Sequence, residues 1–180
     1  MEEVVSETDE TNLLKVRRNV SEFMARCAAE FDRAGALLLD VAPQDHEGAA
    51  PYFRRSTIET LDIDPRSGAT YVADITNDNS DRIPSARFDF VVCTEVLEHT
   101  VQPFDAVREL HRVLKPGGRA FVTTPFNLRI HGPLPDCWRF TEHGLRELFK
   151  EWEVLELKEL EDPDRFLMPT HYTLIAARLG

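Results

Sequence analysis

Glycine is scarce in this chain: eight occur among 180 residues, whereas an average usage of about 7% would supply roughly 13. The three cysteines show no CxxC spacing, which excludes a zinc signature and a disulfide framework. No run of 18 apolar residues occurs, so no membrane span is expected. Residues 1–10 are acidic and lack the apolar stretch of a secretory signal peptide. These absences predict a cytoplasmic protein.

Positive charge is nearly absent from two segments, and they account for the net charge of −11. Residues 1–10 hold five acids and no base, and residues 147–164 hold eight acids and two lysines. Acidic patches repel a phosphate backbone, so nucleic acid is not expected as a partner. The simplest reading of the charge is a disordered acidic tail over residues 1–11 and a solvated face. The length suits one folded domain, which we expect over residues 12–180.

Hydrophobic periodicity predicts strands that alternate with helices. Apolar residues recur every three or four positions from 12 to 31, as on one face of an amphipathic helix. Further helices are predicted at 47–55, 103–114 and 141–149, and short apolar runs predict strands at 36–41, 57–62, 71–74, 88–93, 119–124, 154–157 and 172–176. The link between the second and third strands is too short for a normal helical crossover. The alternation indicates an α/β fold with a mainly parallel sheet.

Polar residues end the first four predicted strands. Asp40, Asp62 and Asp74 follow three of them, and Thr94 follows the fourth. Ligands in open parallel sheets bind beyond the carboxyl ends of the strands. An acid after the second strand can accept both ribose hydroxyls of a nucleotide-like cofactor, and one after the third can accept from an adenine amine. The alternative for each aspartate is a helix cap or a turn.

Several segments, in order along the chain, resemble class I S-adenosylmethionine-dependent methyltransferases of the small, type 11-like kind. The segments are LLLDVAP (37–43), TLDIDP (60–65), YVADITN (71–77), FDFVVCTEVLEH (88–99), RELHRVLKPGGRAFVTTPF (108–126) and WRFTEHGL (138–145). The resemblance implies a Rossmann-like three-layer sandwich whose seven-stranded, mainly parallel sheet has a reversed last strand. It also implies methyl transfer from S-adenosylmethionine, which leaves S-adenosylhomocysteine. The WRFT segment resembles a branch that acts on sugars or glycan precursors.

The resemblance assigns cofactor contacts by position. It places Asp40 and Ala42 along the methionine moiety, with Pro43 in the same loop. Asp62 would hold the ribose. The remaining contacts fall on Ile63, Asp74 and Ile75 around the adenine, and on Thr94, Glu95 and Leu97 beneath the cofactor.

The loop after the first strand departs from the family pattern, which follows the aspartate with a glycine-rich GxGxG turn. Ala42 and Gln44 stand where glycines are expected, and Pro43 lacks an N–H donor. The only glycine of the loop is Gly48. Two outcomes stay open: the loop is re-routed and still binds the cofactor, or the protein binds weakly and does not turn over.

Two histidines are candidate general bases for a hydroxyl acceptor: His99 after the fourth strand and His131 after the fifth. Their alternatives are a helix-capping role and an idle surface position. Trp138 and Arg139 are candidate acceptor-binding residues, because aromatic faces stack on rings and arginine pairs with acids; the alternative is packing of the 125–140 loop. No ligand spacing completes a metal site, so none is predicted.

We therefore expect a methyltransferase that acts on a small hydroxylated acceptor such as a sugar, a glycan precursor or a natural product. The chain has little insertion between its last two strands, so a homodimer is one way to complete the acceptor site. The alternative is a catalytically silent binding or regulatory protein of the same fold. A nicotinamide-binding domain would need G-x-G-x-x-G after the first strand, and that motif is absent.

Overall fold

The computed structural model describes residues 5–43 and 48–180, and its first element is the helix α1 (Glu7–Phe31). The hydroxyl of Ser6 caps this helix by accepting a hydrogen bond from the Asp9 amide (3.1 Å). Acidic residues in the first turn suit the positive end of the helix dipole. The expectation of a disordered tail to residue 11 was therefore wrong from Glu7 onward, because the cap and these acids start the helix five positions early.

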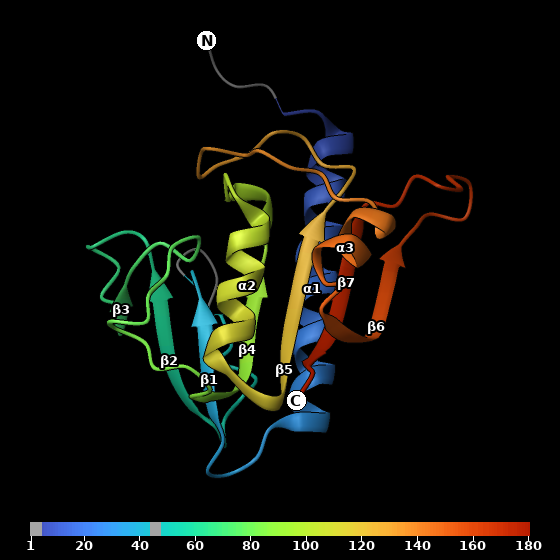
Figure 1. Ribbon diagram of the computed structural model, residues 1–180. Coiled ribbons are helices and arrows are strands. Elements are labelled where there is room, and N and C mark those ends of the chain that lie inside the picture. Colours follow the sequence, from blue (N-terminus) through green and yellow to red (C-terminus); the bar gives the residue numbers. More distant parts are fainter. Residues whose placement is uncertain (1–4, 44–47) are drawn as a thin grey trace.

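A seven-stranded sheet forms the centre of the fold, in the order β3-β2-β1-β4-β5-β7-β6 (Figure 1). The strands are β1 (Leu37–Val41), β2 (Thr57–Asp62), β3 (Tyr71–Val72), β4 (Phe88–Thr94), β5 (Leu114–Pro125), β6 (Trp152–Leu160) and β7 (His171–Arg178). β1, β2, β3, β4 and β5 pair in parallel, and β7 runs antiparallel to both β5 and β6. The predicted sheet with a reversed last strand is confirmed.

Helices cover the two faces of the sheet. The helices α2 (Pro103–Val113) and α3 (Glu142–Leu148) lie in front of it in Figure 1, and α1 lies behind it. The face behind packs Phe23 and Cys27 of α1 against Phe90 and Phe121 of the sheet. In the described part of the chain, no helix has both the length and the apolar composition needed to cross a membrane.

Three predicted elements differ from the structure. The helix expected at 47–55 is a series of turns from residue 48 on, and Glu47 lies outside the described residues. The strand expected at 71–74 ends at Val72, because the Asp74 carboxylate accepts from the Thr76 amide (2.8 Å) and starts a turn. The strand expected at 119–124 is longer in the structure, because β5 runs from Leu114 to Pro125 and includes residues 116–118, where the register against β4 shifts between Phe88 and Phe90.

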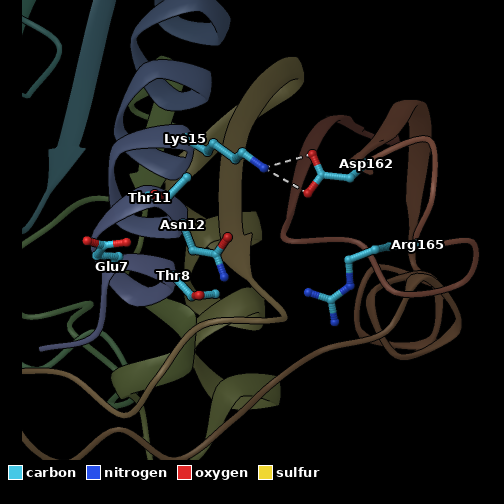
Figure 2. A pocket seen from close by; sticks show the side chains of 7 residues that line it. All are labelled: Glu7, Thr8, Thr11, Asn12, Lys15, Asp162 and Arg165. Carbon is cyan, nitrogen blue, oxygen red and sulfur yellow. Dashed lines mark hydrogen bonds and ion pairs between the residues drawn. The ribbon is translucent and has the colours of Figure 1, made fainter.

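The N-terminal half of α1 borders a polar hollow of about 290 Å³ (Figure 2). Lys15 reaches from α1 to Asp162 in the segment between β6 and β7, and their ion pair measures 2.7 Å. Arg165 of the same segment and Asn12 of α1 also line the hollow. This contact ties the start of α1 to the segment that precedes the reversed strand.

Candidate active site

The carboxyl ends of β1, β2 and β4 meet at one edge of the sheet, at the point where the strand order reverses. Asp40 is the penultimate residue of β1, Asp62 ends β2 and Thr94 ends β4. Parallel pairing of β1 with both neighbours sets these ends side by side. In open α/β sheets this crevice is where ligands bind.

Asp62 is buried and has one oxygen without a partner. Its Oδ1 accepts a hydrogen bond from the Asp64 amide (2.7 Å). Its Oδ2 has no hydrogen-bond partner among residues 5–43 and 48–180. Leaving a buried polar atom unpaired costs about 1–3 kcal/mol, so this oxygen is well suited to accept from a ligand hydroxyl. The next residue, Ile63, is 68% exposed and offers an apolar surface beside it.

Asp40 lies beneath the loop that follows β1. Its Oδ2 accepts a hydrogen bond from the Ala49 amide (2.6 Å). Burial raises the pKa of Asp40 to about 6, and the Ala49 hydrogen bond opposes that rise only in part. The carboxylate is therefore ionised at neutral pH at the expense of stability, and a cationic ligand group beside it would relieve that cost.

Replacement of Asp40 by asparagine should make the stability of the unliganded protein less dependent on pH. The folded pKa of about 6 lies above the unfolded value of about 3.9. The stabilisation from the neutral carboxyl is thus complete below pH 4 and is lost as the pH rises through 6. Relative to wild type, Asp40→Asn should gain up to about 3 kcal/mol between pH 4 and pH 8. Urea unfolding at both pH values measures this gain, and a difference between the proteins that does not change with pH would contradict it.

The loop after β1 keeps a glycine-like backbone without the glycine. Ala42 adopts φ +52°, in the left-handed region, and its amide donates to the Leu61 carbonyl (2.8 Å). This conformation costs an L-residue about 1–2 kcal/mol. Gly48 at φ +55° packs directly over the Asp40 carboxylate and Pro43. Gln44 and residues 45–47 lie outside the described residues.

Asp74 and Ile75 follow β3 at the same edge. The Asp74 Oδ1 accepts from both the amide and the hydroxyl of Thr76 (2.8 Å each). Ile75 is buried in the core in front of the sheet. Asp74 therefore has the turn-forming role that the sequence left open as an alternative.

Glu95 is the first residue after β4, which ends at Thr94. It has φ +54°, and its Oε1 accepts from Thr123 Oγ1 (2.8 Å) and lies 2.6 Å from His171 Nε2. Burial alone would raise the pKa of Glu95, but the charge of His171 and the hydrogen bonds lower it. Leu97 begins the short helix η1 (Leu97–His99) and has no exposed surface. This burial argues against the direct cofactor contact predicted for Leu97.

The two predicted histidines come together around Glu98. The imidazole rings of His99 and His131 lie edge to face, with centroids 4.9 Å apart. Glu98 Oε1 lies 3.8 Å from His99 Nε2 and 4.0 Å from His131 Nε2. Burial and the negative charge of Glu95 hold the pKa of Glu98 well above its usual range.

Arg139 fixes the 125–140 loop. Its guanidinium forms a two-pronged ion pair with Asp136. The remaining N–H groups donate to the backbone carbonyls of Leu128, Arg129 and Trp138. All five N–H donors are thus used within the loop. The acceptor-binding role of Arg139 stays a prediction.

Trp138 is anchored at one edge and open on its face. Its indole N–H donates to the Thr100 carbonyl (2.8 Å), and its ring stacks on Phe140. Trp138 remains 42% exposed and lines an apolar groove of about 540 Å³ with Phe104 and Val101. Trp138 therefore packs the loop and still presents an aromatic surface, and its acceptor-binding role stays a prediction.

Sequence reasoning missed the residues that act across long separations. His171 is fully buried and joins Asn19 of α1 (2.8 Å) to Glu95. Nothing in the spacing along the chain links these partners, although the acid pair Glu95 and Glu98 is visible in the EVLEH segment.

Known proteins resemble this chain at the levels of sequence and fold. A family profile described as a methyltransferase domain matches residues 13–175. The ubiquinone biosynthesis O-methyltransferase of Proteus mirabilis is 33% identical over 105 residues, which is 58% of this chain and 37% of that protein. The enzyme of the same name from Pseudomonas paraeruginosa is 47% identical over 38 residues, 21% of this chain and 16% of that protein. The chain thus spans well under half the length of these curated relatives.

Solved structures share the fold at low sequence identity. The (4+2)-cyclase SpnF has a TM-score of 0.68 and 16% identity, over 90% of this chain and 81% of that one. A Burkholderia thailandensis 1,6-didemethyltoxoflavin-N1-methyltransferase, solved with its substrate and S-adenosylhomocysteine, has a TM-score of 0.62 and 16% identity. The match covers all of this chain and 94% of the Burkholderia thailandensis enzyme. With the matching profile, the sheet order and the cluster of acids at its edge, the chain belongs to the methyltransferase-domain family of class I S-adenosylmethionine-dependent enzymes.

Proposed function

We propose that this chain transfers the methyl group of S-adenosylmethionine to a hydroxyl of a small acceptor. The single observation that carries the proposal is the unpaired, buried Oδ2 of Asp62 at the carboxyl end of β2, beside the exposed Ile63. Bound S-adenosylmethionine supplies an electrophilic sulfonium methyl group. The chain has to bind and orient it, and to take a proton from the acceptor.

The cofactor side of the site divides among three strand ends. Asp62 would accept from the ribose hydroxyls, and Ile63 would pack against the adenine, with Asp74 and Ile75 on its other side. The ionised Asp40 suits the ammonium of the methionine part, which would offset the cost of its burial. Ala42, Pro43, Thr94 and Glu95 complete the proposed contacts through the loop after β1 and the turn after β4.

The acceptor side is proposed to be the histidine pair. A hydroxyl has a pKa far above 7, so its attack on a methyl group benefits from a base. His99 and His131 are partly exposed and stand next to the turn after β4. The hydroxyl preference is also supported by the partial likeness to O-methyltransferases of ubiquinone biosynthesis. Trp138 would stack on the ring of the acceptor.

Replacement of either histidine by asparagine should lower kcat by about 10²–10⁴-fold, because general-base help of that size is lost. His143→Asn, on the exposed face of α3, is the matched control. Assays quenched at set times, with methyl-labelled S-adenosylmethionine, measure the rate of methyl transfer. Calorimetry checks that cofactor affinity stays within a few-fold of wild type. Full turnover in both His99→Asn and His131→Asn would rule out the base assignment.

The proposal as a whole is tested by calorimetry with S-adenosylmethionine and S-adenosylhomocysteine, followed by transfer of labelled methyl to panels of phenols, sugars and amines. Binding with label in the hydroxylated panel supports it. No binding at millimolar cofactor would overturn the enzyme assignment. Label in the amines alone would overturn the hydroxyl preference.

A catalytically silent binding protein is the second candidate. It is favoured by Ala42 in the left-handed region and by Pro43, which together replace the glycine turn. The (4+2)-cyclase SpnF shares this fold but is named for a different reaction. The fold by itself therefore does not establish methyl transfer. Cofactor binding without transfer to any acceptor would favour this reading. A homodimer that completes the acceptor site, and a cytoplasmic location, stay predictions.

A further inference from the structure

We propose that Glu98, His99 and His131 bind one divalent transition-metal ion at the carboxyl edge of the sheet. One ligand atom from each of the three residues lies within 4.8 Å of the others. The sequence predicted no metal, because no ligand spacing along the chain completes a site. The fold supplies the third residue, since the loop after β5 carries His131 back over η1.

The buried carboxylate of Glu98 is the first observation. Neither of its oxygens has a hydrogen-bond partner in the part of the chain that the structure describes, and the side chain has no exposed surface. Imidazole nitrogens of His99 and His131 lie 3.8 and 4.0 Å from Oε1, which is too long for a hydrogen bond. An ion between these atoms would satisfy the carboxylate.

The second observation is the orientation of both rings. His99 Nδ1 lies 3.0 Å from the Pro135 carbonyl. His131 Nδ1 lies 3.1 Å from Asp136 Oδ2 and 3.3 Å from the Arg129 carbonyl. Oxygens of these kinds accept hydrogen bonds, so each Nδ1 carries the hydrogen and each Nε2 has a lone pair. Both Nε2 atoms lie within 4.0 Å of Glu98 Oε1. The Nδ1 contacts are of the kind that orients histidine ligands in metal sites.

The donor set selects the kind of ion. Two imidazoles and one carboxylate suit Zn²⁺, Fe²⁺ or Co²⁺, whereas Mg²⁺ and Ca²⁺ prefer oxygen ligands throughout. Metal–ligand bonds of about 2.1 Å place ligand atoms roughly 3.0–3.4 Å apart. The two separations from Glu98 are 3.8 and 4.0 Å, and all three ligand atoms lie within 4.8 Å of one another, so binding requires the side chains to draw together by roughly 0.5–1.5 Å.

Three protein ligands leave coordination positions open for an acceptor oxygen. With the ion bound, both Nε2 atoms are ligands and cannot act as the base proposed above. A hydroxyl bound to the ion would instead release its proton to solvent more readily, so that its oxygen can bond to the methyl carbon as S-adenosylhomocysteine leaves. This role rests on the proposed function, whereas binding of the ion rests on the geometry of the three residues alone. An acceptor with two neighbouring oxygens would chelate the ion and be preferred.

The test uses the whole chain, stripped with chelator and dialysed against Zn²⁺, Co²⁺ or Mg²⁺. Elemental analysis of the wild type should find about one equivalent of Zn²⁺, and added Zn²⁺ should raise its Tm. The Co²⁺-loaded protein should show the visible absorption of Co²⁺ with nitrogen ligands. Glu98→Gln and His131→Asn should weaken Zn²⁺ binding by more than about 100-fold, because each removes a ligand. Loss of a residue that only hydrogen-bonds to a metal ligand already lowers metal affinity by about 10- to 100-fold. His143→Asn should bind like wild type.

Absence of stoichiometric Zn²⁺ in wild type, or equal binding by Glu98→Gln, would overturn the metal site. Circular dichroism and calorimetry with S-adenosylhomocysteine on the same samples show whether each variant is folded. If Glu98→Gln fails to fold, His131→Asn and His99→Asn decide the outcome, because both side chains are partly exposed. Zn²⁺ binding without cofactor binding would leave the site standing and remove the proposed methyl transfer.

Discussion

Asp62→Ala is expected to weaken binding of S-adenosylhomocysteine by about 10- to 150-fold. Oδ2 of Asp62 has no hydrogen-bond partner among the described residues and would accept from the ribose hydroxyls. Hydrogen bonds to a charged group contribute about 1.5–3 kcal/mol each, which corresponds to that range. Titration calorimetry at fixed pH and salt gives the affinities.

The alanine also removes Oδ1, which holds the Asp64 amide, so a second variant separates the two effects. Asp62→Asn keeps an oxygen for that amide and presents an NH₂ group in place of Oδ2. It should lose nearly as much affinity as the alanine while unfolding at a temperature close to wild type. Asp81→Asn, on an exposed loop beside Arg82, removes the same charge and should bind normally. Unchanged affinity in Asp62→Asn would contradict the ribose assignment.

The sheet was predictable because its signals are local. The runs that became β1 and β4 are mainly apolar and are buried along most of their length, as central parallel strands are. The helix predicted at 141–149 is α3, which Thr141 caps because its hydroxyl accepts from the Gly144 amide (3.1 Å). The helix expected at 47–55 failed because its apolar residues Ala49 and Phe53 pack on the sheet from turns. Local periodicity does not distinguish a helix from turns that bury the same side chains.

The candidate site was predictable only where the strand ends define it. Asp40 and Asp62 follow from the topology of the sheet. The contacts of Glu95 with His171 and of Glu98 with His131 join different elements, and their geometry depends on the path of the loops. The unpaired state of Glu98 is a property of packing, since any exposed glutamate would be hydrated. Arg139 shows a second limit of sequence reasoning. Arginine is a residue type that often binds ligands, but this guanidinium pairs with Asp136 of the same loop.

Gly48→Ala is expected to destabilise the protein by about 2–4 kcal/mol and to weaken cofactor binding with it. A Cβ atom at Gly48 would overlap the Asp40 carboxylate and lie 2.5 Å from Pro43 Cβ. The left-handed backbone adds about 1–2 kcal/mol for any L-residue. Forcing the Asp40 carboxylate aside also breaks its hydrogen bond from the Ala49 amide. Urea unfolding measures the loss.

Gly68→Ala is the matched control, because Gly68 has φ +71° and its Cβ would meet nothing within 4 Å in the described structure. It should show the backbone cost alone, about 1–2 kcal/mol. The excess cost at Gly48 should shrink in an Asp40→Ala background, where the carboxylate is gone, and a double-mutant cycle gives the coupling. Equal costs for the two glycines would mean that the loop yields without strain. A coupling of 1 kcal/mol or more would show that the only glycine of this loop makes room for the acid at the end of β1, so the loop needs its glycine at residue 48 rather than at 42.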